Sequence, residues 1–209
     1  YSMEGEKIDN LNKAVADMLD SFAQEEKMET EILVSVITFG NQVELHIPFT
    51  KASQVQWLDL AADGMTPMGT AFKMAKAMIE DKDTTPSRAY RPTIVLVSDG
   101  HPTDDWEEPL AKFVSAGRSS KCDRMAMAIG SDAEEAVLNR FIEGGPHDLF
   151  YAHNAGQLHE FFQKVTMSVT MRTQSKNPNV VPDPSEIKLD GSSVKTTVSG
   201  NASSDEDGY

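Results

Sequence analysis

The sequence predicts an α/β protein of Rossmann-like, doubly wound type, with a mostly parallel sheet, one antiparallel edge strand and helices on both faces. Strand-like apolar runs alternate with amphipathic helical stretches through the body of the chain, which indicates βαβ crossovers. The run Thr93–Val97 is continuously apolar or β-branched, as in a strand buried on both faces of a parallel sheet. A turn at residues 40–42 joins Glu31–Phe39 to Val43–Ile47, which predicts a hairpin whose second strand lies at the sheet edge.

The other elements follow from the spacing of apolar residues. Residues that recur every three or four positions give each expected helix one buried stripe, and shorter apolar runs indicate strands. Thr103 or Asp104 is expected to cap the helix that follows them, and residues 50–64 are expected to form a short helix and a loop. The remaining helices are predicted over Lys7–Lys27, around Ala71–Ile79, up to about Gly117, and over Glu134–Ile142 and Asn154–Met171, and further strands over Arg124–Ile129 and Leu149–Ala152.

Composition narrows the class of protein and of partner. The 209 residues carry a formal net charge of −14, and a surface this acidic repels nucleic acid and anionic membranes. No stretch approaches the roughly 20 apolar residues of a membrane span. Cys122 is the only cysteine, which excludes an internal disulfide framework and fits a reducing, cytoplasmic location. We therefore expect no nucleic-acid and no membrane partner.

The character of the chain changes near residue 172. Prolines, many serines and an acidic end follow, and such a segment cannot bury a core. The prediction is one domain over 1–172 and a mostly disordered tail over 173–209, with a short strand at Ile187–Leu189.

Three loop residues are expected to meet at the carboxyl edge of the sheet. Asp99 follows the buried strand, at the place where α/β sheets bind ligands, although an Asp-Gly pair is also a common turn cap. Ser2 precedes the first helix, and Thr66 precedes the helix around Ala71–Ile79. Two hydroxyls and a carboxylate suit a hard cation such as Mg²⁺, with Mn²⁺ or Ca²⁺ as alternatives. Zinc is disfavoured, because Cys122 stands alone and no histidine pair has zinc spacing.

Other polar residues near this edge have simpler interpretations. Asp63, Asp104 and Asp105 are interpreted as solvated loop acids. A metal-dependent hydrolase using Asp99, His101 and Asp104 is an alternative, but no nucleophile with a paired base is evident. Neither the G-x-G-x-x-G nor the G-x-x-x-x-G-K-[ST] phosphate-binding pattern occurs in the chain.

Four segments resemble the motifs of von Willebrand factor type A (vWA) domains, in the same order. Tyr1–Asn12 is similar to the loop and first helix after the first strand, and Gly64–Ala71 resembles the threonine loop. Val95–Gly100 resembles the strand that ends in the last acidic residue, and Ala128–Gly130 the strand after it. The resemblance runs from residue 1 to about 170. With residues 101–106, it is closest to the bacterial TerY type of the family.

The resemblance implies a metal-ion-dependent adhesion site (MIDAS). Ser2 matches the second serine of its Asp-x-Ser-x-Ser motif, Thr66 its threonine, and Asp99 its distal aspartate, which often acts through water. The first Asp and first Ser of the motif have no counterpart in the chain. The first strand of the fold, which belongs at the centre of the sheet, is also absent, and both are expected to lie upstream of Tyr1.

The resemblance further implies a non-catalytic function. In this family a Glu or Asp of a partner protein fills an open position on the metal, so the ion joins two proteins. For the TerY type it implies a scaffold in a bacterial stress or tellurite-resistance system, with an operon-linked protein kinase and phosphatase as partners. The alternative is a metal-independent vWA binding module with an inert site.

Overall fold

The computed structural model describes residues 5–26, 30–62 and 64–187 of the chain. Within them, strands and helices alternate as predicted, and most observed boundaries lie within two or three residues of the expected ones. The elements are α1 (Glu6–Glu25), β1 (Leu33–Phe39), β2 (Val43–Lys51), η1 (Ala52–Gln54), α2 (Met68–Glu80), β3 (Thr93–Ser98), α3 (Glu107–Ser115), η2 (Ser119–Lys121), β4 (Asp123–Ile129), α4 (Glu135–Ile142), β5 (Phe150–Ala152), α5 (Ala155–Gln174) and η3 (Pro184–Glu186).

The strands confirm the α/β prediction and divide into two hydrogen-bonded groups. Strands β3, β4 and β5 form a parallel sheet in that order. Strands β1 and β2 form the predicted antiparallel hairpin. In the described part of the chain, no strand is hydrogen-bonded to both groups.

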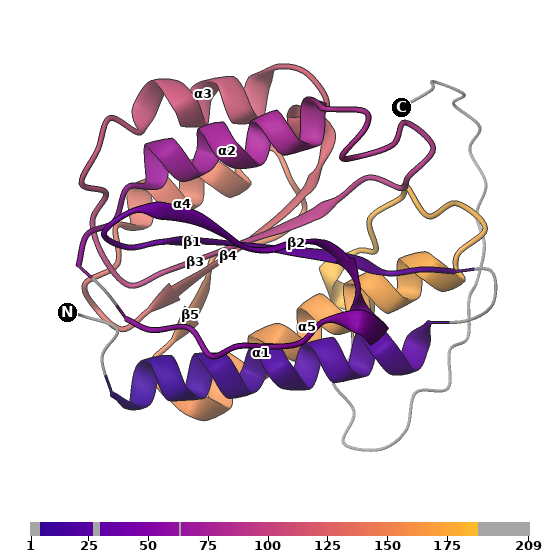
Figure 1. The fold of residues 1–209 in the computed structure, drawn as a ribbon, viewed down its shortest axis with the longest axis horizontal. Coiled ribbons are helices and arrows are strands. Elements are labelled where there is room, and N and C mark those ends of the chain that lie inside the picture. Colours follow the sequence, from indigo (N-terminus) through magenta and orange to yellow (C-terminus); the bar gives the residue numbers. More distant parts are fainter. Residues whose placement is uncertain (1–4, 27–29, 63, 188–209) are drawn as a thin grey trace.

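Helices cover both faces of the sheet (Figure 1). Helices α1 and α5 lie together on one face, and α2, α3 and α4 lie on the other. Strand β4 divides the two cores by the alternation of its side chains. Met125, Met127 and Ile129 face the core of α1 and α5, whereas Ala126 and Ala128 face the other core. Both faces of β4 are therefore buried, as the doubly wound prediction requires for a central strand.

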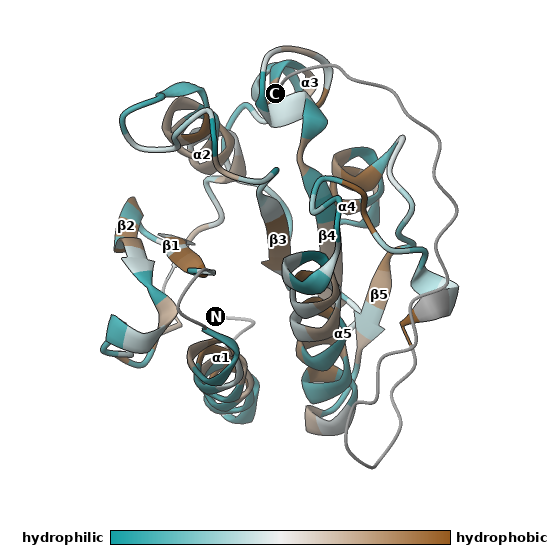
Figure 2. Cartoon of the chain, turned by 90° about the vertical axis from the view of Figure 1, so that its right-hand side faces the viewer, coloured by the Kyte–Doolittle hydropathy of each residue, from teal (hydrophilic) through white to brown (hydrophobic). Residues whose placement is uncertain are grey.

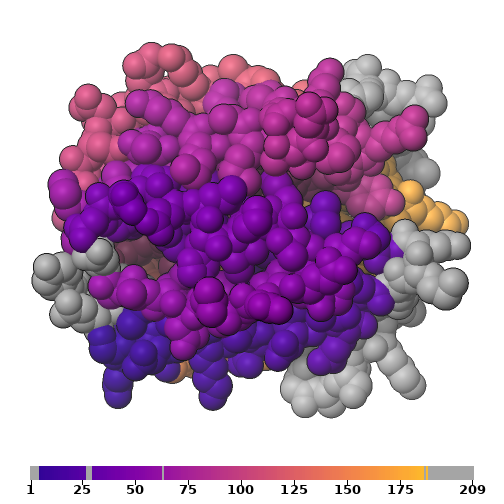
Figure 3. Space-filling view, in the orientation of Figure 1, coloured from indigo at the N-terminus to yellow at the C-terminus, as the bar shows by residue number. Residues whose placement is uncertain are grey.

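A large cavity separates β1 from β3. Its volume is about 1170 Å³, and residues of β1, β3, α1, α2 and α5 line it. In Figure 2, β1 and β3 lie side by side, with α2 on one side of the space and α1 and α5 on the other. Figure 3 shows the hairpin and the loop after it covering the outer face of the molecule between α1 and α2. We call this cavity the central slot.

Two segments differ from or extend the prediction. Residues 50–62 contain the end of β2 and one short 3-10 turn, η1, and residues 55–62 belong to no helix or strand. After α5, the chain stays attached to the domain, because the Arg172 guanidinium donates to the carbonyl oxygens of Pro178 (2.8 Å) and Arg91 (2.6 Å). Of the short strand predicted at residues 187–189, residues 188 and 189 lie outside the described residues. In the described ranges, no helix combines the length and apolar composition of a bilayer span.

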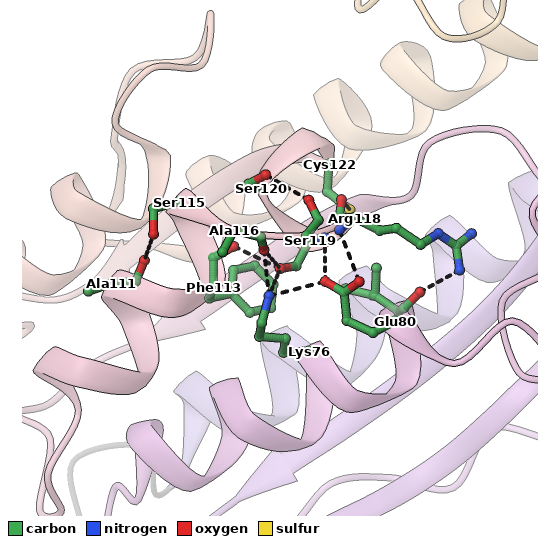
Figure 4. Close-up of polar contacts among 12 residues, drawn as sticks. Lys76, Glu80, Ala111, Phe113, Ser115, Ala116, Arg118, Ser119, Ser120 and Cys122 are labelled. Atoms are coloured by element: carbon green, nitrogen blue, oxygen red, sulfur yellow. Dashed lines mark hydrogen bonds and ion pairs between the residues drawn. The ribbon is translucent and has the colours of Figure 1, made fainter. Parts of the chain in front are cut away.

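Glu80, at the end of α2, ties this helix to the segment before β4 (Figure 4). Its carboxylate accepts hydrogen bonds from the backbone N–H groups of Arg118 (3.0 Å) and Ser119 (3.1 Å) and from Lys76 Nζ (3.1 Å). Partial burial acts to raise the pKa of Glu80, but the two amides and the ammonium outweigh it and lower the pKa to about 2 from 4.5. The charged form of Glu80 is therefore the form that stabilises the fold.

We expect Glu80→Gln to lower the free energy of unfolding at pH 7 by about 1–2 kcal/mol, a figure reduced because the side chain is 33% exposed. Since the pKa is lower in the folded chain, the stabilisation is present above about pH 4.5 and is lost as the pH falls through about 2. Urea unfolding followed by circular dichroism at pH 7 and pH 3 measures both effects. Glu108→Gln, in the exposed pair with Lys112, is the matched control and should change stability less. An equal loss in the two variants would contradict the role given to Glu80.

Candidate metal centre

Asp99 lies at the carboxyl end of β3, buried, with 7% of its surface exposed. No donor among the described residues lies within hydrogen-bond distance of its buried Oδ2 atom. The positively charged Lys7 Nζ, in the first turn of α1, lies 3.8 Å from Asp99 Oδ2. A buried carboxylate oxygen without a hydrogen bond is costly, so this atom is suited to receive a ligand.

The turn after β3 is held by Ser98 rather than by Asp99. The Gly100 N–H donates to Ser98 Oγ at 3.3 Å, and the Ser98 hydroxyl donates to the Gly100 carbonyl oxygen at 3.4 Å. The alternative interpretation of Asp99 as a turn cap therefore has no support in the hydrogen bonds of this turn.

Thr66 lies in the loop before α2, beside the loop after β3. Its N–H donates to Thr103 Oγ1 at 3.0 Å, and the Thr103 N–H donates to the Thr66 carbonyl oxygen at 2.9 Å. The Thr66 carbonyl also accepts from the Met68 N–H at 2.8 Å in a tight turn, and the first helical hydrogen bond of α2 runs from the Ala71 N–H to the Pro67 carbonyl oxygen at 3.1 Å. Thr66 and Asp99 both line the central slot. Through Thr103, the Thr66 loop is hydrogen-bonded to the loop that follows Asp99.

Asp104 caps the helix before it in the chain instead of the helix after it. Its carboxylate accepts from the backbone N–H groups of Gly69 and Thr70 and from the Thr70 hydroxyl, each at 2.8 Å. A negative charge at this end of α2 is favourable, because the first N–H groups of a helix lack partners within it. The expectation that Asp104 is a solvated acid or caps α3 is wrong, since α3 starts after Trp106 with no side-chain cap.

Gly69 permits this close approach of α2 to the loop after β3. A Cβ atom at Gly69 would lie 2.2 Å from the carbonyl oxygen of Asp105, so a larger side chain does not fit there. The glycine and the Asp104 cap together hold Thr66 close to the end of β3.

His101 and Asp104, which the hydrolase alternative uses with Asp99, are engaged elsewhere. His101 Nδ1 lies 2.7 Å from Glu134 Oε2, and its side chain is largely exposed. Asp104 is occupied by α2. No observation in the described residues favours a paired catalytic base beside Asp99.

The remaining predicted residues are not described. Ser2 and Asp63 lie outside the described residues. Within the described part, no group of three or more His, Cys, Asp or Glu side chains could hold a metal ion. Among the described residues, the predicted donors are the Asp99 carboxylate, just after β3, and the hydroxyl of Thr66, whose loop is bonded to Thr103. They fit part of the oxygen shell of a hard cation, and further ligands must come from elsewhere.

Two contributors were missed by sequence reasoning. Lys7 was named only as the first residue of the expected first helix, yet its ammonium lies 3.8 Å from Asp99 Oδ2. Thr103 was considered only as a helix cap, yet it binds the Thr66 loop. No local signal could have found either, because their partners lie 92 and 37 positions away in the chain.

The family model of the von Willebrand factor type A domain matches residues 1–164. A search of curated proteins gives no match. Several solved structures match with similar TM-scores. This chain spans about two fifths of the length of each matched chain. The matched structures include a von Willebrand factor type A protein from Catenulispora acidiphila (20% identity, TM-score 0.59, covering 79% of this chain and 38% of that chain) and the ArnB paralog VWA2 from Sulfolobus acidocaldarius (18% identity, TM-score 0.57, covering 78% and 41%).

A third neighbour carries a metal. Proximal thread matrix protein 1 from the mussel byssus, in a structure with a zinc-occupied MIDAS motif, is 12% identical, with a TM-score of 0.57 over 77% of this chain and 42% of that chain. At these identities the structural neighbours show a shared fold.

Proposed function

The chain belongs to the von Willebrand factor type A domain family, and on this premise we propose that it is a non-catalytic, metal-ion-dependent protein–protein interaction module. The observation that carries the proposal is the buried Asp99 Oδ2, which has no hydrogen-bond donor among the described residues and lines the same cavity as Thr66. The zinc-occupied MIDAS motif of the mussel protein adds support from a protein of the same fold.

The proposed ion is Mg²⁺, with Mn²⁺ or Ca²⁺ as alternatives. Asp99 and Thr66 would hold it, together with Ser2, the third residue that the family resemblance assigns to the site. Oxygen donors of this kind match a hard cation. When bound, the ion supplies an open coordination position for a Glu or Asp carboxylate of the partner protein. The chain itself orients the ion by fixing Asp99 at the end of β3 and Thr66 through Thr103.

The proposed setting is a cytoplasmic scaffold of the TerY type in a bacterial stress or tellurite-resistance system. An operon-linked protein kinase and phosphatase are the proposed partners. Support comes from the resemblance of residues 1 to about 170, together with residues 101–106, to that type and from the reducing compartment that a single cysteine favours. The formal net charge of −14 disfavours nucleic acid and anionic membranes as partners.

Divalent metal is expected to stabilise the chain, and Asp99→Ala is expected to remove that stabilisation. A ligand that binds only the folded state at 100 times its dissociation constant adds about 2.7 kcal/mol to the free energy of unfolding. Thermal unfolding with EDTA, and with increasing Mg²⁺ or Mn²⁺, measures the shift. Thr66→Ala should reduce it as well, because it removes a second oxygen ligand.

Asp105→Ala is the matched control, since Asp105 is an exposed acid in the same loop. It should leave the metal-dependent shift unchanged. A shift of equal size in Asp99→Ala and in the unmodified chain would contradict the metal site.

The second candidate is a metal-independent vWA module, and Lys7 is the observation that favours it. Its ammonium lies 3.8 Å from Asp99 Oδ2 and supplies a positive charge where a cation would bind. In that case partner binding survives EDTA, and Lys7→Met weakens it or leaves it unchanged. Under the metal proposal Lys7→Met removes a competing charge and increases the response to Mg²⁺.

A further inference from the structure

Three arginines lie together at the amino end of β3, opposite the end that carries Asp99. Arg88 and Arg91 lie in the segment between α2 and β3, and Arg172 reaches the same place from α5. All three line the central slot. In the ranges that the structure describes, no carboxylate lies within 4.0 Å of any of these three guanidinium groups. The absence of an ion pair here is notable, because the whole chain has a formal net charge of −14.

The Arg172 guanidinium is buried and is bonded to neutral oxygens. It donates to the carbonyl oxygens of Pro178 (2.8 Å) and Arg91 (2.6 Å) and to Thr93 Oγ1 (2.7 Å). Burial lowers the pKa of Arg172, the charge of Asp123 raises it, and the charge of Arg91 lowers it again. The positive charges of Arg91 and Arg172 therefore lie close enough to repel each other.

The side chain of Arg91 has donors that the fold does not use. The backbone of Arg91 is engaged, because its N–H donates to Asn179 Oδ1 at 2.9 Å and its carbonyl oxygen accepts from Arg172. Its Nε atom, by contrast, is buried without a hydrogen-bond partner among the described residues. A buried N–H group without an acceptor is costly, so an acceptor that reaches it is favourable.

The segment that carries Arg88 and Arg91 is held in place by hydrogen bonds of its own. The Arg118 guanidinium donates to the carbonyl oxygens of Thr85 (2.7 Å) and Pro86 (3.3 Å). Thr85 itself is buried, with 4% of its surface exposed. Donors on a segment that is already fixed lose less conformational freedom when they bind a ligand.

The acids of the same segment do not neutralise these arginines. The carboxylate of Asp81 accepts hydrogen bonds from the Asp83 N–H (3.0 Å) and the Thr84 hydroxyl (2.6 Å), so it stabilises its own turn. Neither Asp81 nor Asp83 forms an ion pair with Arg88 or Arg91 in the described part of the chain. An anion from outside the chain is therefore needed to offset their charge.

We propose that Arg88 and Arg91 bind a phosphate group at this end of the central slot. A phosphate monoester carries a charge of about −1.5 to −2 near pH 7, which two guanidinium groups without a carboxylate offset. The planar guanidinium also matches phosphate oxygens with paired N–H donors. The hydroxyl of Tyr90, which is 53% exposed and lines the slot, is a further donor.

The test uses the 209-residue chain in EDTA, so that its result does not depend on the metal proposal. The isotope-labelled chain is titrated with inorganic phosphate at pH 7, with sodium chloride added to keep the ionic strength constant. Amide signals of residues 84–91 are expected to shift saturably in the nuclear magnetic resonance spectrum. The signals of Gly100 and of β5 should stay unchanged, because they lie away from the amino end of β3.

Matched variants assign the binding to the arginines. Arg91→Gln and Arg88→Gln should each weaken phosphate binding by about tenfold, since each removes a charged donor. Lys82→Gln is the control, because Lys82 is an exposed cation of the same segment outside the slot lining. Arg91→Gln keeps the backbone bonds of residue 91, and Arg88→Gln changes an exposed side chain, so the second variant serves if the first does not fold.

A phosphorylated peptide separates the two sources of phosphate. The probes are a Gly-Ser-Gly peptide phosphorylated on its serine, the same peptide without phosphate, and inorganic phosphate. Tighter binding of the phosphopeptide assigns the site to an esterified phosphate, and tighter binding of inorganic phosphate assigns it to the free anion. Equal weakening by Lys82→Gln and Arg91→Gln, shifts that sodium chloride alone reproduces, or equal binding of the unphosphorylated peptide would each overturn the proposal.

Discussion

Phe141→Ala is expected to lower the free energy of unfolding by about 3–5 kcal/mol. Phe141 of α4 is 1% exposed and lies at the centre of the core between the sheet and α2, α3 and α4. Its ring centroid is 5.9 Å from that of Phe72 and 5.9 Å from that of Phe113, so three helices meet on it. Removing the ring leaves a cavity and takes away its contacts with both neighbouring rings.

Urea unfolding followed by circular dichroism measures this loss. Leu58→Ala is the control, because Leu58 is 70% exposed, and its effect should stay within about 0.5 kcal/mol. A loss below about 1 kcal/mol for Phe141→Ala would mean that the three rings do not form the central contact of this core.

Asp104→Ala is expected to lower the free energy of unfolding by about 2 kcal/mol. The substitution removes three hydrogen bonds to the start of α2 and the negative charge that this helix end favours. It also frees the Thr66 loop from the end of β3, so the response to divalent metal should fall with the stability.

Asp105→Ala is the matched control, since it removes an adjacent acid that is exposed and leaves the cap intact. Asp104→Asn is a second comparison, because an amide keeps one acceptor and loses the charge. If Asp105→Ala cost as much stability as Asp104→Ala, the cap would not be the reason for the loss.

The fold class and most element positions could be predicted from the sequence, because they depend on local periodicity. The continuous apolar run predicted β3 and the alternating pattern predicted β2, although Leu45 of β2 is 42% exposed, and helical stripes reflect a single buried side. The position of Asp99 at a strand end follows in the same way. The secondary structure of residues 50–62 was harder to predict, because a short helix and an irregular segment with a few apolar residues have similar sequence patterns.

The contacts of the site could not be predicted, because they join residues far apart in the chain. Asp104 caps a helix that begins 36 residues before it, and the sequence offered a nearer helix to cap. Lys7 lies beside Asp99 only because the folded chain brings the first turn of α1 to the end of β3. Cap preference is a local rule, and tertiary packing decides which of two helix ends an acid reaches.

By itself the sequence determined the α/β class, the order of the elements and the placement of Asp99 and Thr66 in loops, since each depends on residues close together in the chain. Only the tertiary structure decided that Asp99 Oδ2 is buried without a hydrogen-bond donor among the described residues, that Asp104 serves α2, and that β1 and β3 face each other across an apolar slot. The physical reason is that burial and strand pairing are properties of surfaces from distant segments, which exist only after the helices have packed on the sheet.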